Sequence, residues 1–363
     1  RNSTGDVAAA GEVSTLAPAL SVLDLVPVRS DQSTGDALVA TRGLASVADE
    51  LGFHRYWLAE HHNMPAIAAT NPPLLVAMVA AATEQIRVGS GGVMLPNHAP
   101  LVVAEQFALL EAAYPGRIDL GIGRAPGTDQ VTAWALRHGG GGVEDDAVAR
   151  FPEAVANIIA MLSPDGVGLR LTSGMHVLRA TPHATSVPEV WLLGSSDYSA
   201  QLAAQQGLPY VFAHHFSGRG TAEALALYRD NFQPSPEYPE PRTFLTVSAV
   251  VAPTREEAER LALPNLASMV ALRTGQPLRA QQLVEEVEES NFSLDASDLA
   301  RQMLDRWVVG TPELAAEQLC SLATMFAVDE VMVHPVAGAV RGTPTDRSPA
   351  REQTLRLLRA ALT

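Results

Sequence analysis

The sequence predicts an α/β fold, a (β/α)8 TIM barrel. From Leu20 onward, short apolar segments alternate with helical ones, and this alternation is typical of a parallel sheet with helices outside it. Eight strand-like segments occur, and a helical segment at 347–362 follows the last of them. Eight units with a closing helix favour a closed barrel over the alternative, an open doubly wound sheet.

The expected elements begin and end at residues with clear local preferences. Gly52 ends the first helix, and Pro72 and Pro73 open the second, where proline is tolerated in the first turn. The expected strands cover residues 20–28, 53–59, 86–96, 117–127, 187–194, 208–216, 244–252 and 329–335. The expected helices between them cover residues 36–52, 72–84, 101–114, 196–207 and 221–232.

Two long connections interrupt the alternation, and we expect them to be insertions after strands four and seven. The first holds a glycine-rich loop at 138–142, a helix at 144–162 and a small hairpin at 167–182. The second, 253–326, is mostly helical. Residues 1–18 are small and polar and are expected to form a poorly ordered leader, so 19–363 would form a single domain.

Composition excludes several classes of function. A net charge of -15 argues against nucleic acid and anionic membranes as partners. All 25 basic residues are arginines, which excludes Schiff-base lysine chemistry and pyridoxal-phosphate anchoring. The single cysteine, Cys320, excludes an intrachain disulfide. The chain shows neither a signal-peptide pattern nor an apolar run of membrane-spanning length, so a cytoplasmic location is expected.

The stretch FHRYWLAEHHN, residues 53–63, contains the first candidate catalytic groups. A buried strand ends here in Glu60, His61 and His62. Because strand residues alternate between faces, two adjacent histidines cannot both point into a core, so at least one faces a pocket or solvent. The plainer interpretation is a capping glutamate with two solvated histidines. In a parallel α/β enzyme, however, ligands bind at this edge of the sheet.

Two further patterns predict a site for a flat ligand with a phosphate. Glycine weakens a strand, so Gly91 and Gly92, with Met94 beyond them, indicate either a bulge or close approach of a flat ring. After expected strand five, a glycine turn leads into serines at a helix start, which suits an anion, with Arg124 as a possible guanidinium partner. The alternative is an ordinary serine N-cap. These serines are Ser195, Ser196 and Ser199. A flavin mononucleotide would suit both patterns.

Four motifs in this order resemble the bacterial luciferase-like flavin monooxygenases, most closely the single-chain, alkanal-monooxygenase-like group. The motifs are YWLAEHHN, IRVGSGGVMLP, GRIDLGIGRAPG and WLLGSSDYSAQLAAQQGLP, and the resemblance covers roughly residues 20–335. It implies an eightfold barrel that binds reduced FMN supplied by a separate reductase. Such enzymes add O2 at the flavin C4a to form a peroxyflavin, which oxygenates an organic substrate.

The resemblance also implies a role for individual residues. His61 matches a pocket histidine proposed as acid/base, supported by His62 and Glu60, and Gly91 and Gly92 match a non-proline cis peptide under the flavin ring. Arg124, Ser195, Ser196 and Ser199 match the phosphate site. Trp191, Phe212, Ala213 and His214 would lie near the ribityl chain and ring. Residues 274–300 match a mobile lid, and the helical segments 76–83 and 102–114 would form a homodimer interface.

Some departures from the family pattern keep other functions open. Luciferase has a reactive cysteine where this chain has Gly123, and Ser195 replaces an acidic residue, so light emission from a long aldehyde is not expected. Some members use the deazaflavin F420 instead. We expect hydroxylation or epoxidation of a secondary metabolite such as a polyketide. A non-catalytic flavin-binding protein is one alternative. The other is a metal-dependent hydrolase that uses Asp24 and the histidines at 61, 62, 214, 215 and 334.

Overall fold

The computed structural model, described for residues 17–137, 146–295 and 297–363, is built on eight parallel strands that close into a barrel. The expectations for residues 1–16 and for the loop at 138–142 lie outside the described residues. The barrel strands are β1 (Ala19–Asp24), β2 (Arg55–Leu58), β3 (Arg87–Met94), β4 (Ile118–Gly123), β7 (Glu189–Gly194), β8 (Tyr210–Phe212), β9 (Thr243–Val251) and β11 (Glu330–Pro335).

The strand pairings show that the sheet is closed. Their order is β9-β11-β1-β2-β3-β4-β7-β8, and β8 pairs with β9 to complete the ring. Val22, for example, is in register with Tyr56 on one side and Val333 on the other. The predicted TIM barrel is therefore confirmed, and an open doubly wound sheet is not formed.

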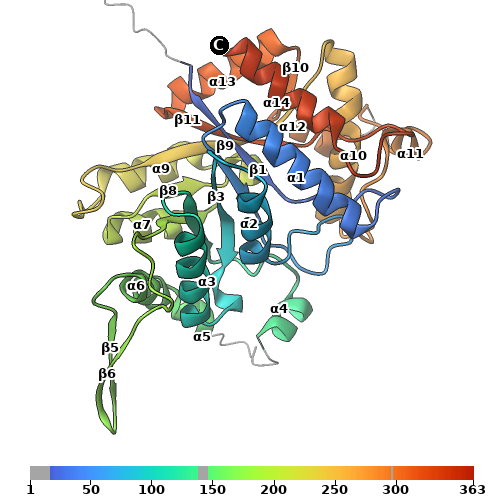
Figure 1. Cartoon of the computed structure of the whole chain (residues 1–363). Coiled ribbons are helices and arrows are strands. Elements are labelled where there is room, and N and C mark those ends of the chain that lie inside the picture. The colour runs from blue at the N-terminus through green and yellow to red at the C-terminus, as the bar shows by residue number, and fades with distance from the viewer. Residues whose placement is uncertain (1–16, 138–145, 296) are drawn as a thin grey trace, which may run out of the picture.

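Helices surround the barrel and bury their apolar faces on it (Figure 1). Local sequence explains where several of them begin, because Ser33 forms a capping box with Asp36, and Pro72, Pro100 and Pro312 each open a helix. The outer helices are α1 (Thr34–Glu50), α2 (Pro72–Ala81), α3 (Pro100–Ala113), α6 (Phe151–Leu162), α7 (Asp197–Gln206), α9 (Thr221–Asp230), α13 (Pro312–Phe326) and α14 (Pro349–Ala361).

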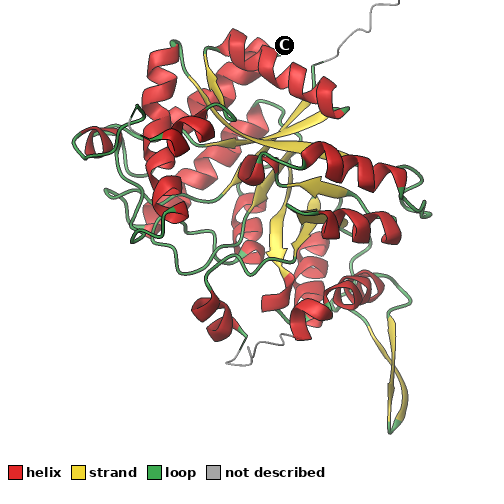
Figure 2. Ribbon diagram, turned by 180° about the vertical axis from the view of Figure 1, so that it is seen from behind, coloured by secondary structure: helices red, strands yellow, loops and turns green. Residues whose placement is uncertain are grey.

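The connection between β4 and β7 holds a hairpin that projects from the body of the protein (Figure 2). Its antiparallel strands, β5 (Val167–Leu171) and β6 (Gly174–Leu178), confirm the hairpin predicted at 167–182. Two short helices also lie in this connection, α4 (Gln130–Leu136) and α5 (Asp146–Ala149).

The connection between β9 and β11 differs in one respect from the mostly helical segment that was predicted. It contains α10 (Arg255–Arg273), α11 (Val284–Glu288) and α12 (Asp298–Leu304), but Val308–Gly310 forms strand β10, which pairs with the end of β9. A second correction concerns residues 208–216, because β8 ends at Phe212 and His214–Ser217 form the short helix α8. No helix in the described ranges is long and apolar enough to cross a membrane.

Charged and aromatic side chains fill the amino-terminal end of the barrel, which we call the barrel floor. Asp119 is fully buried and accepts hydrogen bonds from Arg55 Nη1 at 2.8 Å and Arg87 Nη2 at 2.6 Å. Glu330 accepts from Arg55 Nε at 2.7 Å. The aromatic rings of Trp57, Trp191 and Phe244 pack above this network, with centroids 5.0–5.8 Å apart. This packing closes one end of the barrel, and open space remains at the other.

Candidate active site

A cavity of about 1420 Å³ lies at the carboxyl ends of the barrel strands. Ligands of TIM barrels bind at this end, because the loops after the strands converge there. The strand ends supply one part of the wall, and α8, α10 and residues 276–282 supply another. Its volume exceeds that of a typical single-ligand pocket, roughly 300–1,000 Å³, so it has room for a cofactor together with a second molecule.

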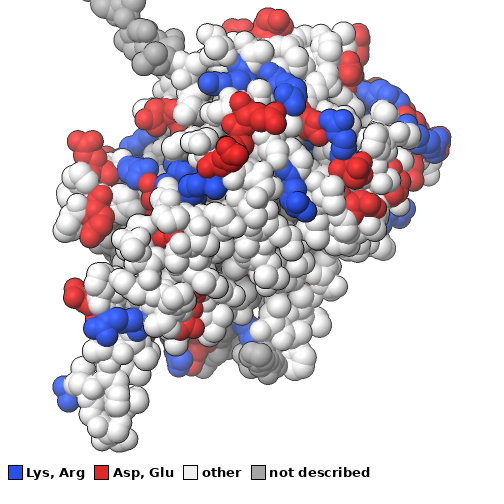
Figure 3. Space-filling model, in the orientation of Figure 1, with Lys and Arg blue, Asp and Glu red and all other residues white. Residues whose placement is uncertain are grey.

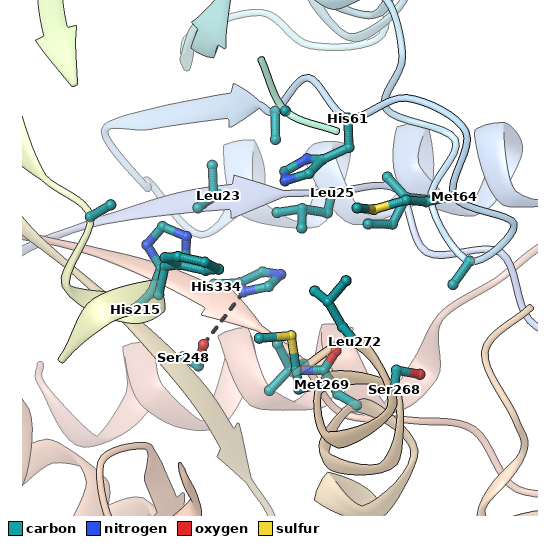
Figure 4. Close-up of a pocket in the computed structure, with 18 of the residues that line it drawn as sticks. Leu23, Leu25, His61, Met64, His215, Ser248, Ser268, Met269, Leu272 and His334 are labelled. Atoms are coloured by element: carbon teal, nitrogen blue, oxygen red, sulfur yellow. Dashed lines mark hydrogen bonds between the residues drawn. The ribbon is translucent and has the colours of Figure 1, made fainter. Parts of the chain in front are cut away.

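Three half-buried histidines, His61, His215 and His334, line this cavity and form what we call the imidazole cluster (Figure 4). The rings of His215 and His334 lie 5.8 Å apart. Burial lowers the pKa of His61 to about 4 and that of His215 to about 4, and it holds the pKa of His334 well below its ordinary value. All three imidazoles are therefore neutral near pH 7.

The hydrogen bond of His215 and the lack of a partner at His61 Nδ1 indicate which nitrogen of each ring carries the proton. Thr246 Oγ1 donates to Phe212 O at 3.3 Å and thus accepts from His215 Nδ1 at 2.9 Å, so His215 Nε2 is left as an acceptor. His61 Nδ1 is buried without a hydrogen-bond partner in the described structure. A buried N–H without an acceptor is costly, so the neutral His61 carries its proton on Nε2. The imidazole cluster thus contains a hydrogen-bond donor, His61 Nε2–H, and an acceptor, His215 Nε2.

Glu60 is fully buried beside the cavity and holds the loop that carries His61. Its carboxylate accepts hydrogen bonds from His62 Nε2 at 2.7 Å, His98 Nε2 at 2.8 Å and the Met94 backbone N–H at 2.8 Å. Burial alone would raise the pKa of Glu60, but the hydrogen bonds from His62 and His98 bring that pKa down to about 2. Glu60 is therefore a charged positioning residue, and it does not face the cavity.

A group of anion-binding side chains, which we call the phosphate cradle, lies on the wall formed after β4 and β7. It consists of Arg124, Ser195 and Ser196, all of which line the cavity. Ser196 is the N-cap of α7, and its hydroxyl makes no capping hydrogen bond. The first N–H groups of a helix have no partner within the helix, so the start of α7 adds backbone donors. The Arg124 guanidinium lies 4.1 Å from the Tyr198 ring centroid.

The wall next to this cradle is glycine backbone from β3. The Gly91–Gly92 peptide bond is cis, and both residues line the cavity. A Cβ on Gly91 would lie 3.0 Å from both Leu23 Cδ1 and Trp57 Cβ, and a Cβ on Gly92 would lie 2.9 Å from Gly121 O. Close packing therefore requires glycine at both positions.

Five other residues predicted for the site also line the cavity. They are His62, Met94, Ser199, Ala213 and His214. Burial and then the charge of Arg306 lower the pKa of His214.

Trp191 and Phe212 are not brought to the cavity wall. Trp191 is buried with Trp57 and Phe244, and its Nε1 donates to Glu189 at 3.2 Å. Phe212 belongs to the core between the barrel and its helices, because its neighbour Val211 takes the inward position.

Some lining residues had not been singled out in the sequence. Ser248 lies 3.4 Å from His334 Nδ1, and Met269 and Leu272 of α10 point into the cavity opposite the imidazole cluster (Figure 4). A helix in a long connection gives no sequence signal that it covers the barrel mouth. His98, which contacts Glu60 and does not line the cavity, follows β3 in the sequence PNHAP, and its place after a predicted strand end was a signal that could have identified it.

The arrangement of these groups does not favour a metal centre. Asp24 is fully buried and turned away from the cavity, where it accepts hydrogen bonds from Thr41 Oγ1 at 2.9 Å and Arg351 Nη2 at 2.6 Å. In the part of the chain that the structure describes, no group of three His, Cys, Asp or Glu side chains is placed to hold a metal ion.

Comparison with known proteins places this site in a family. The family model described as luciferase-like monooxygenase matches residues 19–329. A luciferase-like monooxygenase from Escherichia coli (strain K12) is 40% identical over 317 residues, which span 87% of this chain and 91% of the relative. An N-acetyl-S-alkylcysteine monooxygenase from Bacillus subtilis (strain 168) is 34% identical and covers 88% of this chain and 94% of its own length.

Solved structures agree with this result. Apo-MsnO8 matches with a TM-score of 0.79 and 32% identity, covering 96% of this chain and 98% of its own. A type II Baeyer-Villiger monooxygenase component from Pseudomonas putida, in complex with FMN, matches with a TM-score of 0.68 at 18% identity, which shows the fold alone. The chain therefore belongs to the luciferase-like monooxygenase family, as its motifs predicted, and is an oxidoreductase of the monooxygenase type.

Proposed function

We propose that the protein binds reduced FMN and uses O2 to oxygenate a small organic substrate. The main observation behind this proposal is that one cavity combines an anion-binding cradle, a flat glycine wall and a cluster of neutral imidazoles. An FMN molecule has a phosphate at one end and a flat ring at the other. The glycine wall belongs to β3, and the cradle follows β4 and β7, which are the next two strands in the sheet. Reduced FMN supplies the electrons that activate O2.

The phosphate would be held by the cradle. Arg124 offers a guanidinium, Ser195 and Ser196 offer hydroxyls, and the start of α7 offers backbone N–H groups. The two serines are exposed at the cavity mouth, and the Ser196 hydroxyl makes no capping hydrogen bond to α7. The donor set therefore suits a dianion.

The residues around the ring would bind and orient the reacting groups. The ring would lie against the backbone of Gly91 and Gly92, which line the cavity. His61 presents Nε2–H to the cavity and is proposed as the acid/base group, with its loop fixed by Glu60 and His62. Residues 276–282 and 290–292 line the same cavity, which supports the proposal that the segment 274–300 acts as a lid and would exclude water from the reaction.

The reductant and the substrate come from outside the chain in this proposal. The glycine-rich turn at 121–127 lacks the G-x-G-x-x-G spacing of a nicotinamide dinucleotide fingerprint, so a separate flavin reductase would supply reduced FMN. A related protein is named as acting on N-acetyl-S-alkylcysteine, which makes a thioether one candidate substrate beside the expected secondary metabolite, such as a polyketide.

We also propose a homodimer through α2 and α3. Leu74 and Met78 on α2 are 59% and 42% exposed, and Val102 and Leu109 on α3 are 50% and 56% exposed. The surface over these helices carries few charged side chains in Figure 3. An apolar patch of this kind is typical of an interface. A light-scattering mass near that of one chain, 38.4 kDa, would contradict the dimer.

Anaerobic titration tests the cofactor assignment. The protein is titrated with reduced FMN and, in parallel, with reduced F420, and air is then admitted in the presence of candidate substrates. Tight binding of reduced FMN and formation of an oxygenated product support the proposal. Binding of F420 alone, or of neither molecule, would overturn it.

A further inference from the structure

Three arginines gather around α8 without a carboxylate partner. Arg273 Nη2 donates to Phe216 O at 3.0 Å, and Arg306 Nη1 donates to Ser217 O at 3.3 Å. Arg219 lies two residues after the end of α8. Among the described residues, none of the three arginines forms an ion pair with Asp or Glu. Three positive charges thus share a small region of a chain whose net charge is -15.

The fold holds these charges together although they repel each other. Burial lowers the pKa of Arg306, and the positive charges of Arg273 and Arg219 lower it further. The carbonyls of Phe216 and Ser217 orient the two guanidinium groups but carry only partial negative charge. Such a group of cations is completed electrostatically by an anion.

Two of these arginines belong to the cavity wall, on α10 and after α12. Arg273 and Arg306 line the cavity, and Arg273 lies four residues after Met269 on α10. Residues four apart share a face of a helix, with Cβ atoms about 5–6 Å apart. Figure 4 shows Met269 and Leu272 directed toward the cavity opposite His334. Along α10, the wall therefore changes from apolar to cationic within one helical turn.

The short helix α8 also brings the arginine pair close to the imidazole cluster. His215 belongs to the imidazole cluster, and the carbonyls that hold Arg273 and Arg306 come one and two residues later. The arginine pair is also separate in origin from the phosphate cradle. The pair comes from the connection between β9 and β11, whereas the cradle follows β4 and β7.

We propose that Arg273 and Arg306 bind the carboxylate of an organic-anion substrate. The apolar part of that substrate lies against Met269 and Leu272 and presents the atom to be oxygenated beside the imidazole cluster. The substrate class is thus an apolar molecule with one carboxylate a few bonds from the reacting atom. The oxygenation step rests on the proposed function, but carboxylate binding does not require the flavin.

The test compares binding of 4-phenylbutyrate with that of its neutral amide, 4-phenylbutanamide, to the full chain without flavin, by titration calorimetry. We expect the wild type to bind the carboxylate roughly tenfold or more tightly, the scale of a charge-assisted hydrogen bond. Raising the NaCl concentration from 50 to 500 mM should weaken binding of the carboxylate and leave the amide unchanged. The double variant Arg273→Gln, Arg306→Gln should lose the preference.

Two control variants localise the effect. Arg301→Gln changes an exposed arginine that pairs with Asp295, and Arg124→Ala removes the competing anion site in the phosphate cradle. Both should keep the preference for the carboxylate. Equal affinity of the wild type for acid and amide would overturn the inference, as would a double variant that keeps the preference.

A titration with reduced FMN separates this inference from the proposed function. The double variant should bind reduced FMN as the wild type does. A tenfold loss of reduced-FMN affinity, with the carboxylate preference retained, would assign the arginine pair to the cofactor and overturn the inference. If the wild type shows the carboxylate preference but binds no reduced FMN, the proposed function fails and the anion site stands.

Discussion

The two ends of the barrel contain similar kinds of residue but use them in opposite ways. At the barrel floor, Arg55, Asp119 and Glu330 satisfy each other's charges, and aromatic rings fill the space above them. At the mouth, His61 Nδ1 has no partner in the described structure, and the imidazole cluster faces a large cavity. A buried polar group without a partner costs stability. The floor is therefore built for stability, and the mouth keeps its polar groups for ligands.

The largest expected effect concerns the barrel floor. Arg55 Nη1 and Trp57 Nε1 both donate a hydrogen bond to Asp119 Oδ2, and the variant Asp119→Ala removes this acceptor. Breaking a buried ion pair typically costs about 3–5 kcal/mol, so the free energy of unfolding measured in urea should fall by about this amount. Asp295→Ala, which removes the partner of exposed Arg301, is the control and should stay within about 0.5 kcal/mol. If Asp119→Ala lowered the free energy of unfolding by less than about 1 kcal/mol, the floor would not be the stabilising end of the barrel.

At the mouth, the same kind of truncation should affect turnover rather than folding. His61→Ala deletes a ring whose Nδ1 makes no hydrogen bond in the described structure, so the free energy of unfolding should change little. Product formed per reduced FMN supplied should fall roughly a hundredfold or more, the scale of a lost acid/base group. Reduced-FMN affinity should stay within several-fold. Unchanged turnover would exclude His61 from the mechanism.

The pH dependence of stability gives a smaller effect with a defined sign. The folded pKa values of His61 and His215, about 4, lie below the value of about 6.5 in an unfolded chain. Between these values the unfolded state binds protons that the folded state does not, so stability is lost as the pH falls from about 6.5 toward 4. The upper limit is about 1.4 kcal/mol per pH unit for each histidine.

Denaturation in urea at pH 7, 6 and 5 measures this slope. His61→Asn should make the slope shallower, because one titrating ring is removed. Glu60 titrates in a lower window, since its folded pKa of about 2 lies below its unfolded value, and its contribution is lost only at more acidic pH. An identical slope in His61→Asn would mean that the imidazole at position 61 is not held neutral by the fold.

The barrel could be predicted from the sequence because its repeating units leave a strong signal. Pro72 also marked the start of α2 correctly, and the first helix, expected from residue 36, begins at Thr34. It was harder to predict which side chains of each strand point into the barrel and which point toward the helices. Strands of a barrel are buried on both sides, so the run LPYVFAHHF contains no alternation that shows Val211 inward and Phe212 outward. Asp24 ends β1, although the expected strand ran on to residue 28, and its partner Arg351 is 327 positions away and draws it outward.

The candidate site was predictable where a motif has a local geometry. Gly91 and Gly92, and the serines before α7, take conformations that depend on their immediate neighbours. The covering side of the cavity was not predictable, because Met269, Leu272 and Arg273 come from a long connection whose path depends on tertiary packing. The arginine pair around α8 also became visible only once the chain was folded.

The most direct test of the central claim compares reduced FMN with reduced riboflavin, which lacks the phosphate, in the wild type and in Arg124→Ala. Affinities are measured by anaerobic titration. The wild type should bind reduced FMN more tightly than reduced riboflavin, and Arg124→Ala should lose about 1.5–3 kcal/mol of FMN binding while its riboflavin binding stays unchanged. Equal loss for both flavins, or no loss for FMN, would contradict a phosphate site at the mouth of the barrel.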